Sequence, residues 1–420
     1  MLTNNVIPTD NRFIPYLQQK LVVLFPELFP EFFSDRSTTP ALTGLLRIDS
    51  RQIEHHDIFV ALNGTQHKGR DFIPSAIEKG AGLVLLESDV DGLYWFESIP
   101  IVALKDLRHR LGAWLAAAGE LNTGSPHLIG ITGTNGKTSV SHYLAQLLEM
   151  LGEKAAVIGT VGIGALNDLK TATHTTPDLI QLHQVLAALK RQDFNYQVME
   201  VSSHALDQQR TAGVPFEVGV FTNLSRDHLD YHGNMETYFA AKCRMFELLE
   251  TQGGNKKPTA VVNLDDPYGQ RLVEEFKGRL YFLTYGHGVH ADLRIGREKQ
   301  TVRGTEFEVK YKDREYLVRT PYIGKFNVSN CAAALAACCA AGIKPRDAVR
   351  AFADAPQVPG RMESVGSRDG ATLFVDYAHT PDAIENACAA VRELHPKRLI
   401  TVFGCGGDRD RTKRPLMGKA

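Results

Sequence analysis

The sequence lacks any apolar run of the roughly 18 residues that a membrane-spanning helix needs. It also lacks net charge of either sign, because 47 Lys and Arg residues are balanced by 48 Asp and Glu residues. Such a balance argues against nucleic acid or a membrane surface as the main partner. Residues 1–10 have neither the basic start nor the apolar core of a signal peptide. We therefore expect a cytoplasmic protein that does not insert into a membrane.

Cysteine is scarce, and no pair of cysteines forms a CxxC motif. Most of the six cysteines lie in alanine-rich apolar stretches, which favours buried free thiols in a reducing compartment. They are Cys243, Cys331, Cys338, Cys339, Cys388 and Cys405. The 420 residues are 43% hydrophobic and 23% charged, which is typical of globular proteins and excludes a disordered chain. At roughly 150 residues per domain, two or three domains are expected.

The order of apolar segments predicts an α/β fold with three domains. Residues 1–125 read as a small α/β unit, with strands at 57–62, 82–86 and 99–102 and a helix at 107–120. In residues 126–357 apolar strands alternate with amphipathic helices, which favours a buried parallel sheet. Its strands are expected at 128–132, 155–159, 197–201, 218–223 and 260–263, and a helix of small residues at 329–341.

A third domain is predicted to begin at residue 358. Its pattern is a βαβ unit, with a strand at 372–376, a helix at 382–394 and a second strand at 398–403. About 60 residues are too few for a closed α/β domain of this kind. We therefore expect the domain formed by residues 358–420 to be incomplete.

A glycine-rich loop between a strand and a helix predicts a phosphate-binding site. The strand at 128–132 leads into Gly133-Thr134-Asn135-Gly136-Lys137-Thr138, and the following helix has one apolar face. Backbone N–H groups of such a loop bind phosphate oxygens, Lys137 would reach the β- and γ-phosphates, and Thr138 would bind Mg²⁺. Ile131 stands where the usual motif has glycine, so the loop is a variant. The alternative is a glycine turn with a surface lysine.

Three residues farther along the chain have polar groups suited to a metal or phosphate site. Glu200 ends a buried strand, where carboxylates of parallel sheets face the ligand crevice, and it is either a Mg²⁺ ligand or structural. His228 lies in a loop rich in Asp and His, and it is either a metal ligand or a capping or core histidine. Lys242 has apolar helical neighbours, which by themselves favour a surface lysine with a buried stem.

Seven ordered motifs resemble those of the Mur ligase family, ATP-dependent enzymes that add amino acids to the UDP-MurNAc peptide precursor of peptidoglycan. They are TGTNGKT at 132–138, EVSSH at 200–204, NLSRDHLD at 223–230, NLDD at 263–266, GKFNVSN at 324–330, PGRME at 359–363 and DYAHTPD at 376–382. The resemblance covers essentially the whole chain. It implies a central P-loop ATPase domain with a parallel sheet, an N-terminal UDP-MurNAc-binding domain and a Rossmann-like C-terminal domain that is truncated here.

Within that family, three segments are most similar to the members that add the third residue of the peptide. The segments are 49–51, 202–204 and 403–417. The closer resemblance is to the meso-2,6-diaminopimelate-adding type. It implies a monomeric bacterial ligase that uses ATP and joins meso-diaminopimelate to UDP-MurNAc-L-Ala-D-Glu through an acyl phosphate, releasing ADP. The Asp-Asn-Pro-Arg signature of this type would lie some twenty residues past Ala420.

Three alternatives remain open at this point. One is a member that adds L-lysine instead of diaminopimelate. Another is a folylpolyglutamate synthase, whose loop typically reads TGTNGKGS, whereas Thr138 directly follows Lys137 here. The third is a truncated chain that binds nucleotide and UDP substrate without ligating them.

The resemblance also implies roles for individual residues. Catalysis would involve Lys137, Glu200, His228 and Lys242, the last as a carbamate. Magnesium would be bound by Thr138, Glu200, His228 and the carbamate of Lys242. ATP would contact the loop Gly133, Thr134, Asn135, Gly136, Lys137 and Thr138, with Asn263 and Asn327 near adenine, Arg361 at the phosphates and Asp376 at the ribose. The UDP-MurNAc-peptide would contact Ser50, Thr65, Gln66, His67, Thr175, Thr176, Ser202, Gln208 and Arg210. Arg409 would contact the incoming diamino acid.

Overall fold

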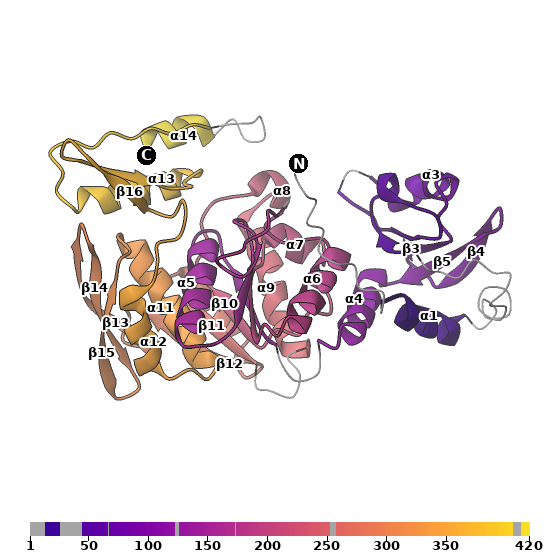
Figure 1. Cartoon of the computed structure of the whole chain (residues 1–420), viewed down its shortest axis with the longest axis horizontal. Helices are drawn as coiled ribbons and strands as arrows, with labels where there is room; N and C mark the ends of the chain where they lie inside the picture. The colour runs from indigo at the N-terminus through magenta and orange to yellow at the C-terminus, as the bar shows by residue number, and fades with distance from the viewer. Residues whose placement is uncertain are drawn as a thin grey trace. The chain divides into compact units, whose positions relative to one another are not determined.

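The computed structural model describes residues 13–25, 44–65, 67–121, 126–172, 174–252, 258–405 and 413–420 (Figure 1). The chain forms two compact units, each built from several segments. The first unit comprises residues 1–125, 177–193 and 207–215, and the second comprises residues 126–176, 194–206 and 216–420. Helix α6 (Leu179–Arg191), which lies inside the predicted domain 126–357, therefore clusters with the first unit. The division into three domains, 1–125, 126–357 and 358–420, stays a prediction.

The first unit is built on a five-stranded sheet with the order β1-β2-β3-β5-β4. Strand β4 runs antiparallel to β5, and the other neighbouring pairs are parallel. The strands are β1 (Leu46–Arg47), β2 (Ile58–Ala61), β3 (Leu83–Ser88), β4 (Gly92–Phe96) and β5 (Ile99–Lys105). The helices are α1 (Phe13–Leu24), η1 (Ser50–Gln52), η2 (Gly69–Phe72), α3 (Ile73–Glu78) and α4 (Leu107–Ala118), together with α6.

Helical spacing explains how α4 and α6 join the core of the first unit. Leu107, Leu111 and Leu115 recur every four residues on one face of α4 and are buried. They share a core with Ile180 and Ala187 of α6. Helix α6 begins where the Asp178 side chain accepts hydrogen bonds from two free backbone N–H groups of the first turn, which fixes the start of the helix.

The second unit is built on a ten-stranded sheet with the order β15-β14-β13-β12-β11-β10-β6-β9-β7-β8. The strands from β13 to β7 in that order are parallel, whereas β14 and β15 continue as an antiparallel meander and β8 is antiparallel to β7. The strands are β6 (His127–Thr132), β7 (Ala155–Ile158), β8 (Ile163–Gly164), β9 (Tyr196–Glu200), β10 (Val218–Phe221), β11 (Thr259–Asn263), β12 (Tyr281–Gly286), β13 (Leu293–Thr301), β14 (Gly304–Tyr311) and β15 (Arg314–Thr320).

Helices cover both faces of this sheet, as continuous apolar strands require. Ile129 and Ile131 of β6 pack in one core with α5 (Lys137–Met150) and α11 (Lys325–Ala340). The intervening Gly130 faces Met245 of α9 (Met235–Gln252). Because successive strand residues point to opposite faces, α9 lies on the other side of the sheet. The other helices before residue 358 in this unit are α7 (Ser203–Asp207), α8 (Leu229–His232), α10 (Pro267–Glu275), α12 (Pro345–Ala351) and η3 (Phe352–Asp354).

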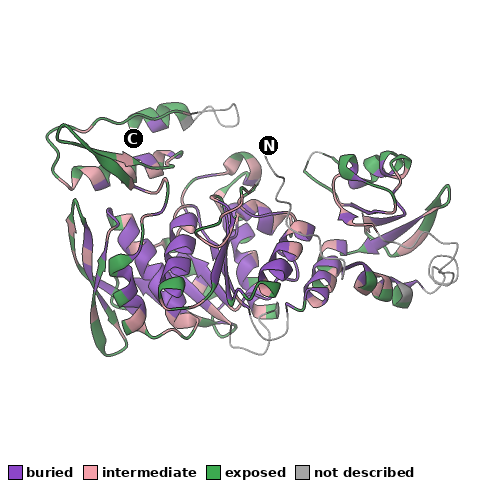
Figure 2. Ribbon diagram, viewed as in Figure 1, coloured by how far each residue is buried: buried purple, intermediate pink, exposed green. Residues whose placement is uncertain are grey.

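The C-terminal segment differs from the predicted βαβ unit. The predicted strand at 372–376 is β17 (Ala371–Val375), but it pairs antiparallel with β16 (Glu363–Arg368), and α13 (Pro381–Arg392) follows. The predicted strand at 398–403 is wrong, since residues 398–405 form no strand. A strand needs a neighbouring strand to pair with, and this segment has none among the described residues; Val402 is 93% exposed. Figure 2 shows that β16 is also largely exposed. Helix α14 (Lys413–Lys419) is the last of the described helices.

The predicted α/β class is confirmed by this architecture. None of the helices described is long and apolar enough to cross a membrane. All six cysteines are free thiols, as predicted. Cys243, Cys331 and Cys338 are buried, and the other three are half-buried.

Candidate functional site

The loop between β6 and α5 has a backbone shape that only glycine allows at two positions. Gly133 and Gly136 have φ angles of +149° and +89°. A Cβ atom on Gly133 would lie 1.9 Å from the Thr222 hydroxyl oxygen, and one on Gly136 would lie 2.4 Å from Asn330 Oδ1. Both close approaches bring polar groups against the loop. The glycines thus permit both the turn and the packing around it.

The loop is joined to the end of the neighbouring strand β10 by neutral hydrogen bonds. The backbone N–H of Asn135 donates to Asn223 Oδ1 at 2.9 Å. The Asn135 carbonyl accepts from the Thr222 hydroxyl at 2.6 Å and from Asn223 Nδ2 at 3.1 Å. The Asn135 amide in turn donates to Asp382 Oδ2 at the start of α13, at 2.8 Å. These contacts hold the loop against the carboxyl end of the sheet.

Two lysines share one carbonyl oxygen of this loop. Lys137 Nζ donates to the carbonyls of Gly133 and Thr134 at 2.8 and 2.9 Å, and Lys242 Nζ donates to the same Gly133 carbonyl at 2.8 Å. Burial lowers the pKa of Lys137, and it holds the pKa of Lys242 well below its usual range, with Lys137 lowering it further. Lys242 is 1% exposed, so the reading of it as a surface lysine is wrong. Its helix face turns inward, toward the loop.

Tyr238, one turn before Lys242 on α9, links this lysine to the loop. Lys242 Nζ lies 4.6 Å from the centre of the Tyr238 ring, and the Tyr238 hydroxyl lies 3.1 Å from the Thr134 hydroxyl. The ring also stacks on His232, whose Nε2 lies 2.9 Å from the Ser203 hydroxyl. Tyr238 is 1% exposed and was not among the residues predicted from sequence.

The Glu200 carboxylate, at the end of β9, is buried and accepts hydrogen bonds on both oxygens. The Thr138 hydroxyl donates to Oε2 at 2.8 Å. Thr160 donates to Oε1 through its backbone N–H at 2.9 Å and to Oε2 through its hydroxyl at 3.1 Å. A Cβ atom on Gly159 would lie 2.1 Å from Oε1, so the carboxylate fills the space beside that glycine. The sequence prediction did not include Thr160.

Hydroxyl groups connect Glu200 to three residues expected to contact the acceptor substrate. The Thr160 hydroxyl lies 3.1 Å from that of Thr175. The Thr176 hydroxyl donates to the Glu200 backbone carbonyl at 2.9 Å and accepts from the Ser202 N–H at 3.1 Å. The residues expected to hold metal and those expected to hold peptide therefore lie side by side at the ends of β7 and β9.

His228 lies in a left-handed backbone conformation, with φ of +53°, directly before α8. Its Nε2 lies 3.4 Å from Asp227 Oδ2, and its ring meets that of His204 edge-on. Burial lowers the pKa of His228 to about 4, although Asp227 opposes the shift. The imidazole is therefore neutral at pH 7, the form that binds metal ions.

The residues expected around the nucleotide differ in accessibility. Arg361 Nη2 donates to the Thr138 hydroxyl at 2.9 Å, which brings a guanidinium to the loop. Asp376 accepts from the Met362 N–H at 2.8 Å, and burial raises its pKa. Asn263 and Asn327 are 7% and 1% exposed. Asn263 bonds the Thr222 carbonyl and the Asp265 N–H, and Asn327 bonds the Tyr143 hydroxyl, the Asn330 amide and the Ile323 carbonyl.

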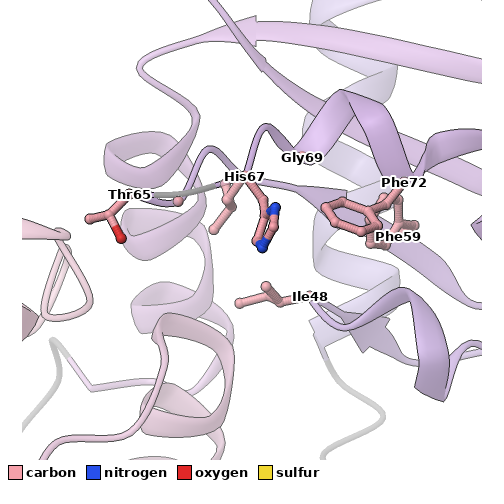
Figure 3. A pocket seen from close by; sticks show the side chains of 8 residues that line it. Ile48, Phe59, Thr65, His67, Gly69 and Phe72 are labelled. Atoms are coloured by element: carbon pink, nitrogen blue, oxygen red, sulfur yellow. The ribbon is translucent and has the colours of Figure 1, made fainter. Parts of the chain in front are cut away.

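The first unit contains a cavity of about 290 Å³ at the loop after β2 (Figure 3). Thr65 and His67 line it, and the His67 ring meets Phe72 edge-on at 5.9 Å between ring centres. Ser50 is buried and does not line this cavity. Gln208 and Arg210, also in this unit, pair through Gln208 Oε1. Gln66 and Arg409 lie outside the described residues.

Three family models match the chain in succession. The Mur ligase family catalytic domain matches residues 44–117, the Mur ligase middle domain matches 131–338, and the Mur ligase glutamate ligase domain matches 360–420. A UDP-N-acetylmuramoyl-L-alanyl-D-glutamate–2,6-diaminopimelate ligase of Chromobacterium violaceum is 44% identical over 375 residues, covering 88% of this chain and 74% of that protein. The chain belongs to the Mur ligase family.

Two further comparisons agree with this membership. The Coxiella burnetii ligase of the same name is 42% identical over 385 residues, which is 90% of this Mur ligase and 78% of that protein. A solved structure, also of a UDP-N-acetylmuramoyl-L-alanyl-D-glutamate–2,6-diaminopimelate ligase, superimposes with a TM-score of 0.73 at 35% identity, over 94% of this chain and 79% of that one. The predicted family is confirmed, and the chain is an ATP-dependent ligase.

Proposed function

We propose that this Mur ligase joins meso-2,6-diaminopimelate to UDP-MurNAc-L-Ala-D-Glu at the expense of ATP, in the synthesis of peptidoglycan precursors. The names of the relatives at 44% and 42% identity support the choice of substrates. The observation that carries the chemistry is that two cationic side chains, Lys137 and Arg361, meet at the phosphate-type loop formed by residues 133–138. A carboxylate and a triphosphate repel each other, so an enzyme that joins them must first neutralise charge.

In the proposed reaction, the free carboxylate of the D-Glu residue attacks the γ-phosphorus of ATP. The bond from that phosphorus to the β–γ bridging oxygen breaks, and ADP and an acyl phosphate form. Lys137 and the loop N–H groups stabilise the charge that develops on the phosphate oxygens, together with Arg361. The amino group of diaminopimelate then attacks the acyl carbon, loses a proton, and phosphate leaves as the amide forms.

The residues around Glu200 fit a magnesium site. Carboxylate and hydroxyl oxygens are the donors that Mg²⁺ prefers, and Glu200 Oε2 and the Thr138 hydroxyl lie 2.8 Å apart. The neutral imidazole of His228 is a further donor. In the described part of the chain no three His, Cys, Asp or Glu side chains are grouped to hold a metal ion, so the proposed site relies on phosphate and water oxygens for its other ligands. When bound, Mg²⁺ would neutralise charge on the transferred phosphoryl group.

We propose that Lys242 is carbamylated. A neutral amine adds to carbon dioxide, forming an N–C bond and releasing a proton, and the product is an anion. The low pKa caused by burial favours the neutral amine that this reaction needs. The ammonium of Lys137, which bonds the same Gly133 carbonyl, would then stabilise the carbamate.

The remaining predicted residues are assigned to the substrates. Asp376 would bind the ribose of ATP, and Asn263 and Asn327, being buried and already hydrogen-bonded, would shape the adenine site by holding its walls. Arg409 would bind the diamino acid. Ser50, Thr65, Gln66 and His67 would form the uridine diphosphate site, and Thr175, Thr176, Ser202, Gln208 and Arg210 would contact the peptide.

The test is ADP release by the purified chain with UDP-MurNAc-L-Ala-D-Glu, offered meso-diaminopimelate, L-lysine or neither. We expect ADP to form in proportion to a product whose mass includes diaminopimelate, with little ADP in the other two reactions. Equal use of lysine would favour the lysine-adding alternative. Binding of ATP and of UDP-MurNAc-L-Ala-D-Glu without ADP release would favour the third alternative, a chain that binds these substrates without ligating them.

A cytoplasmic location in bacteria and a monomeric state belong to the same proposal, since all three substrates are small and water-soluble. Light scattering of the purified protein checks the monomer, and a mass of about twice 46.4 kDa would contradict it.

A further inference from the structure

One arginine of the first unit joins the cavity loop to the segment expected to contact the peptide. Arg108 lies at the start of α4, and each of its nitrogens makes a hydrogen bond. Nε donates to Glu87 Oε1 at 2.8 Å, Nη1 to the Gln208 carbonyl at 2.7 Å, and Nη2 to the Asn63 carbonyl at 2.5 Å and to Glu87 Oε2 at 3.3 Å. The Arg108 and Glu87 side chains are only 15% and 23% exposed.

On one side of this guanidinium lies the loop that forms the cavity. Glu87 Oε2 accepts from the Asn63 N–H at 2.7 Å, so both polar groups of the Asn63 backbone bond the Arg108–Glu87 pair. The Asn63 side chain accepts from the Gly69 N–H at 3.3 Å and so closes the loop on itself. Leu62, Gly64 and Thr65, on either side of Asn63, line the cavity. The wall of the cavity therefore depends on this ion pair.

On the other side lies the segment 207–215, which packs on the same helix. A Cβ atom on Gly112 of α4 would lie 2.2 Å from the Ala212 carbonyl oxygen, so the two backbones touch. Arg108 bonds the backbone of Gln208, whose side chain in turn accepts two hydrogen bonds from Arg210. The Gln208–Arg210 pair is thereby held at a fixed distance from the cavity loop.

We propose that Arg108 is a positioning residue that holds the uridine diphosphate pocket and the peptide-contacting pair Gln208–Arg210 in one arrangement, so that both ends of the acceptor are bound together. The inference rests on the proposed function. A planar guanidinium has N–H groups on three nitrogens, and here they satisfy two carbonyls and a carboxylate at once. Lysine has one nitrogen and cannot reproduce that geometry. An exposed ion pair would stabilise the fold only weakly, but this pair is largely buried and bonds two backbone carbonyls.

The experiment compares Arg108→Gln and Arg108→Lys with Arg110→Gln, a matched control on the same helix. Arg110 also pairs with a carboxylate, Asp91, at 2.8 Å, but among the described residues its side chain has no hydrogen bond to the cavity loop or to segment 207–215. The readouts are the affinity for UDP by calorimetry, the KM values for acceptor and ATP, kcat, and the midpoint of thermal unfolding. We expect Arg108→Gln to weaken UDP binding and raise the acceptor KM by about tenfold, with Arg108→Lys intermediate. The ATP KM should stay constant, and Arg110→Gln should match wild type.

Wild-type UDP affinity in Arg108→Gln would overturn the inference, and so would an equal loss in Arg110→Gln. Glu87→Gln provides a second variant if Arg108→Gln does not fold. It should weaken UDP binding because it removes the charge that anchors Arg108 and leaves one acceptor oxygen in place of the two that bond Arg108 and the Asn63 N–H, and unchanged affinity would count against the inference. A wild-type protein that does not bind UDP would overturn the proposed function, and this inference with it.

Discussion

The phosphate-type loop after β6 and the cavity loop after β2 both follow a parallel strand, yet different interactions hold them. The first, residues 133–137, is fixed by glycine geometry and by neutral hydrogen bonds to Thr222 and Asn223. The second loop, of which residues 62–65 and 67–69 are described, is held at Asn63 by a charged pair formed by Arg108 of α4 and Glu87 of β3. A loop of the first kind is visible as a contiguous motif. A loop of the second kind has no such motif, because its support lies 24 and 45 residues away.

The largest expected effect is a loss of ADP formation that leaves UDP binding intact, because the two loops serve different substrates. Lys137→Ala should abolish ADP formation, by about a thousandfold or more, because the lysine neutralises phosphate charge in the second unit. UDP binding should survive, since the proposed uridine site lies in the first unit. Coupled-enzyme assay of ADP and calorimetry with UDP measure both. Lys312→Ala, an exposed lysine of the same unit, is the control. Near-normal ATP turnover in Lys137→Ala would contradict the assignment of the loop.

A somewhat smaller loss is expected from the second lysine of the loop. Lys242→Ala should lower kcat by about a hundredfold to a thousandfold, because it removes the proposed carbamate. Added acetate or formate should restore part of the activity, since a small carboxylate can occupy the vacated space. Mass spectrometry of the wild-type protein under bicarbonate should find 44 Da more on Lys242 than the unmodified side chain. Full activity of Lys242→Ala without added carboxylate would reject the proposal.

Removal of the Thr160 hydroxyl tests whether the reaction depends on the hydrogen bond that orients the Glu200 carboxylate. Thr160→Val keeps the backbone N–H bond to Glu200 but loses the hydroxyl bond and the link to Thr175. We expect kcat to fall by about tenfold and the Mg²⁺ concentration for half-maximal rate to rise, since the buried Glu200 Oε2 loses one of its two hydroxyl donors. Thr160→Ser should retain most activity. If Val and Ser behave alike, the hydroxyl has no part in positioning Glu200.

The smallest effect concerns stability in acid, and it involves the first unit. His183 of α6 is fully buried, and burial lowers its pKa to about 4. The unfolded chain binds a proton near pH 6.5 while the folded chain does not, so the free energy of unfolding falls as pH drops from about 6.5 to 4. His183→Gln keeps a donor for the Ala212 carbonyl but cannot titrate. Between pH 7 and pH 5 it should lose about 1–2 kcal/mol less than wild type in urea titrations. Equal losses would show that His183 is not the acid-sensitive group.

Contiguous apolar segments in the sequence were sufficient to predict many of the strands of the second unit. The strands predicted at 128–132, 155–159, 197–201, 218–223 and 260–263 correspond to β6, β7, β9, β10 and β11, with ends shifted by no more than two residues. Helix α11 begins at Lys325, four residues before the predicted start, because Gly324 precedes it with a φ of +97° and the GKFNVSN motif is itself helical. The antiparallel meander β13–β15 was missed. Its outward positions are exposed and charged, so its strands have no continuous apolar run.

Three residue pairs around the proposed binding sites could not be predicted from the neighbouring sequence. Thr160 lies 40 residues from Glu200, Tyr238 lies 104 residues from Thr134, and Arg108 lies 100 residues from Gln208. Threonine, tyrosine and arginine are common in helices and loops, and nothing in their immediate neighbours distinguishes these three. Only the strand order brings their partners within hydrogen-bonding distance.

Residue type and spacing were enough to establish which chemical groups this protein has and which segments are strands, helices and tight turns. Those properties depend on a few neighbouring residues and on the periods of 2 and 3.6 residues. The pKa values and hydrogen-bond partners of those groups were decided by the tertiary structure. Lys242 is an ordinary lysine in the sequence, but its pKa falls well below the usual range because the fold buries it beside Lys137. Desolvation and pairing depend on every atom around a group, and residues distant in sequence supply most of those atoms.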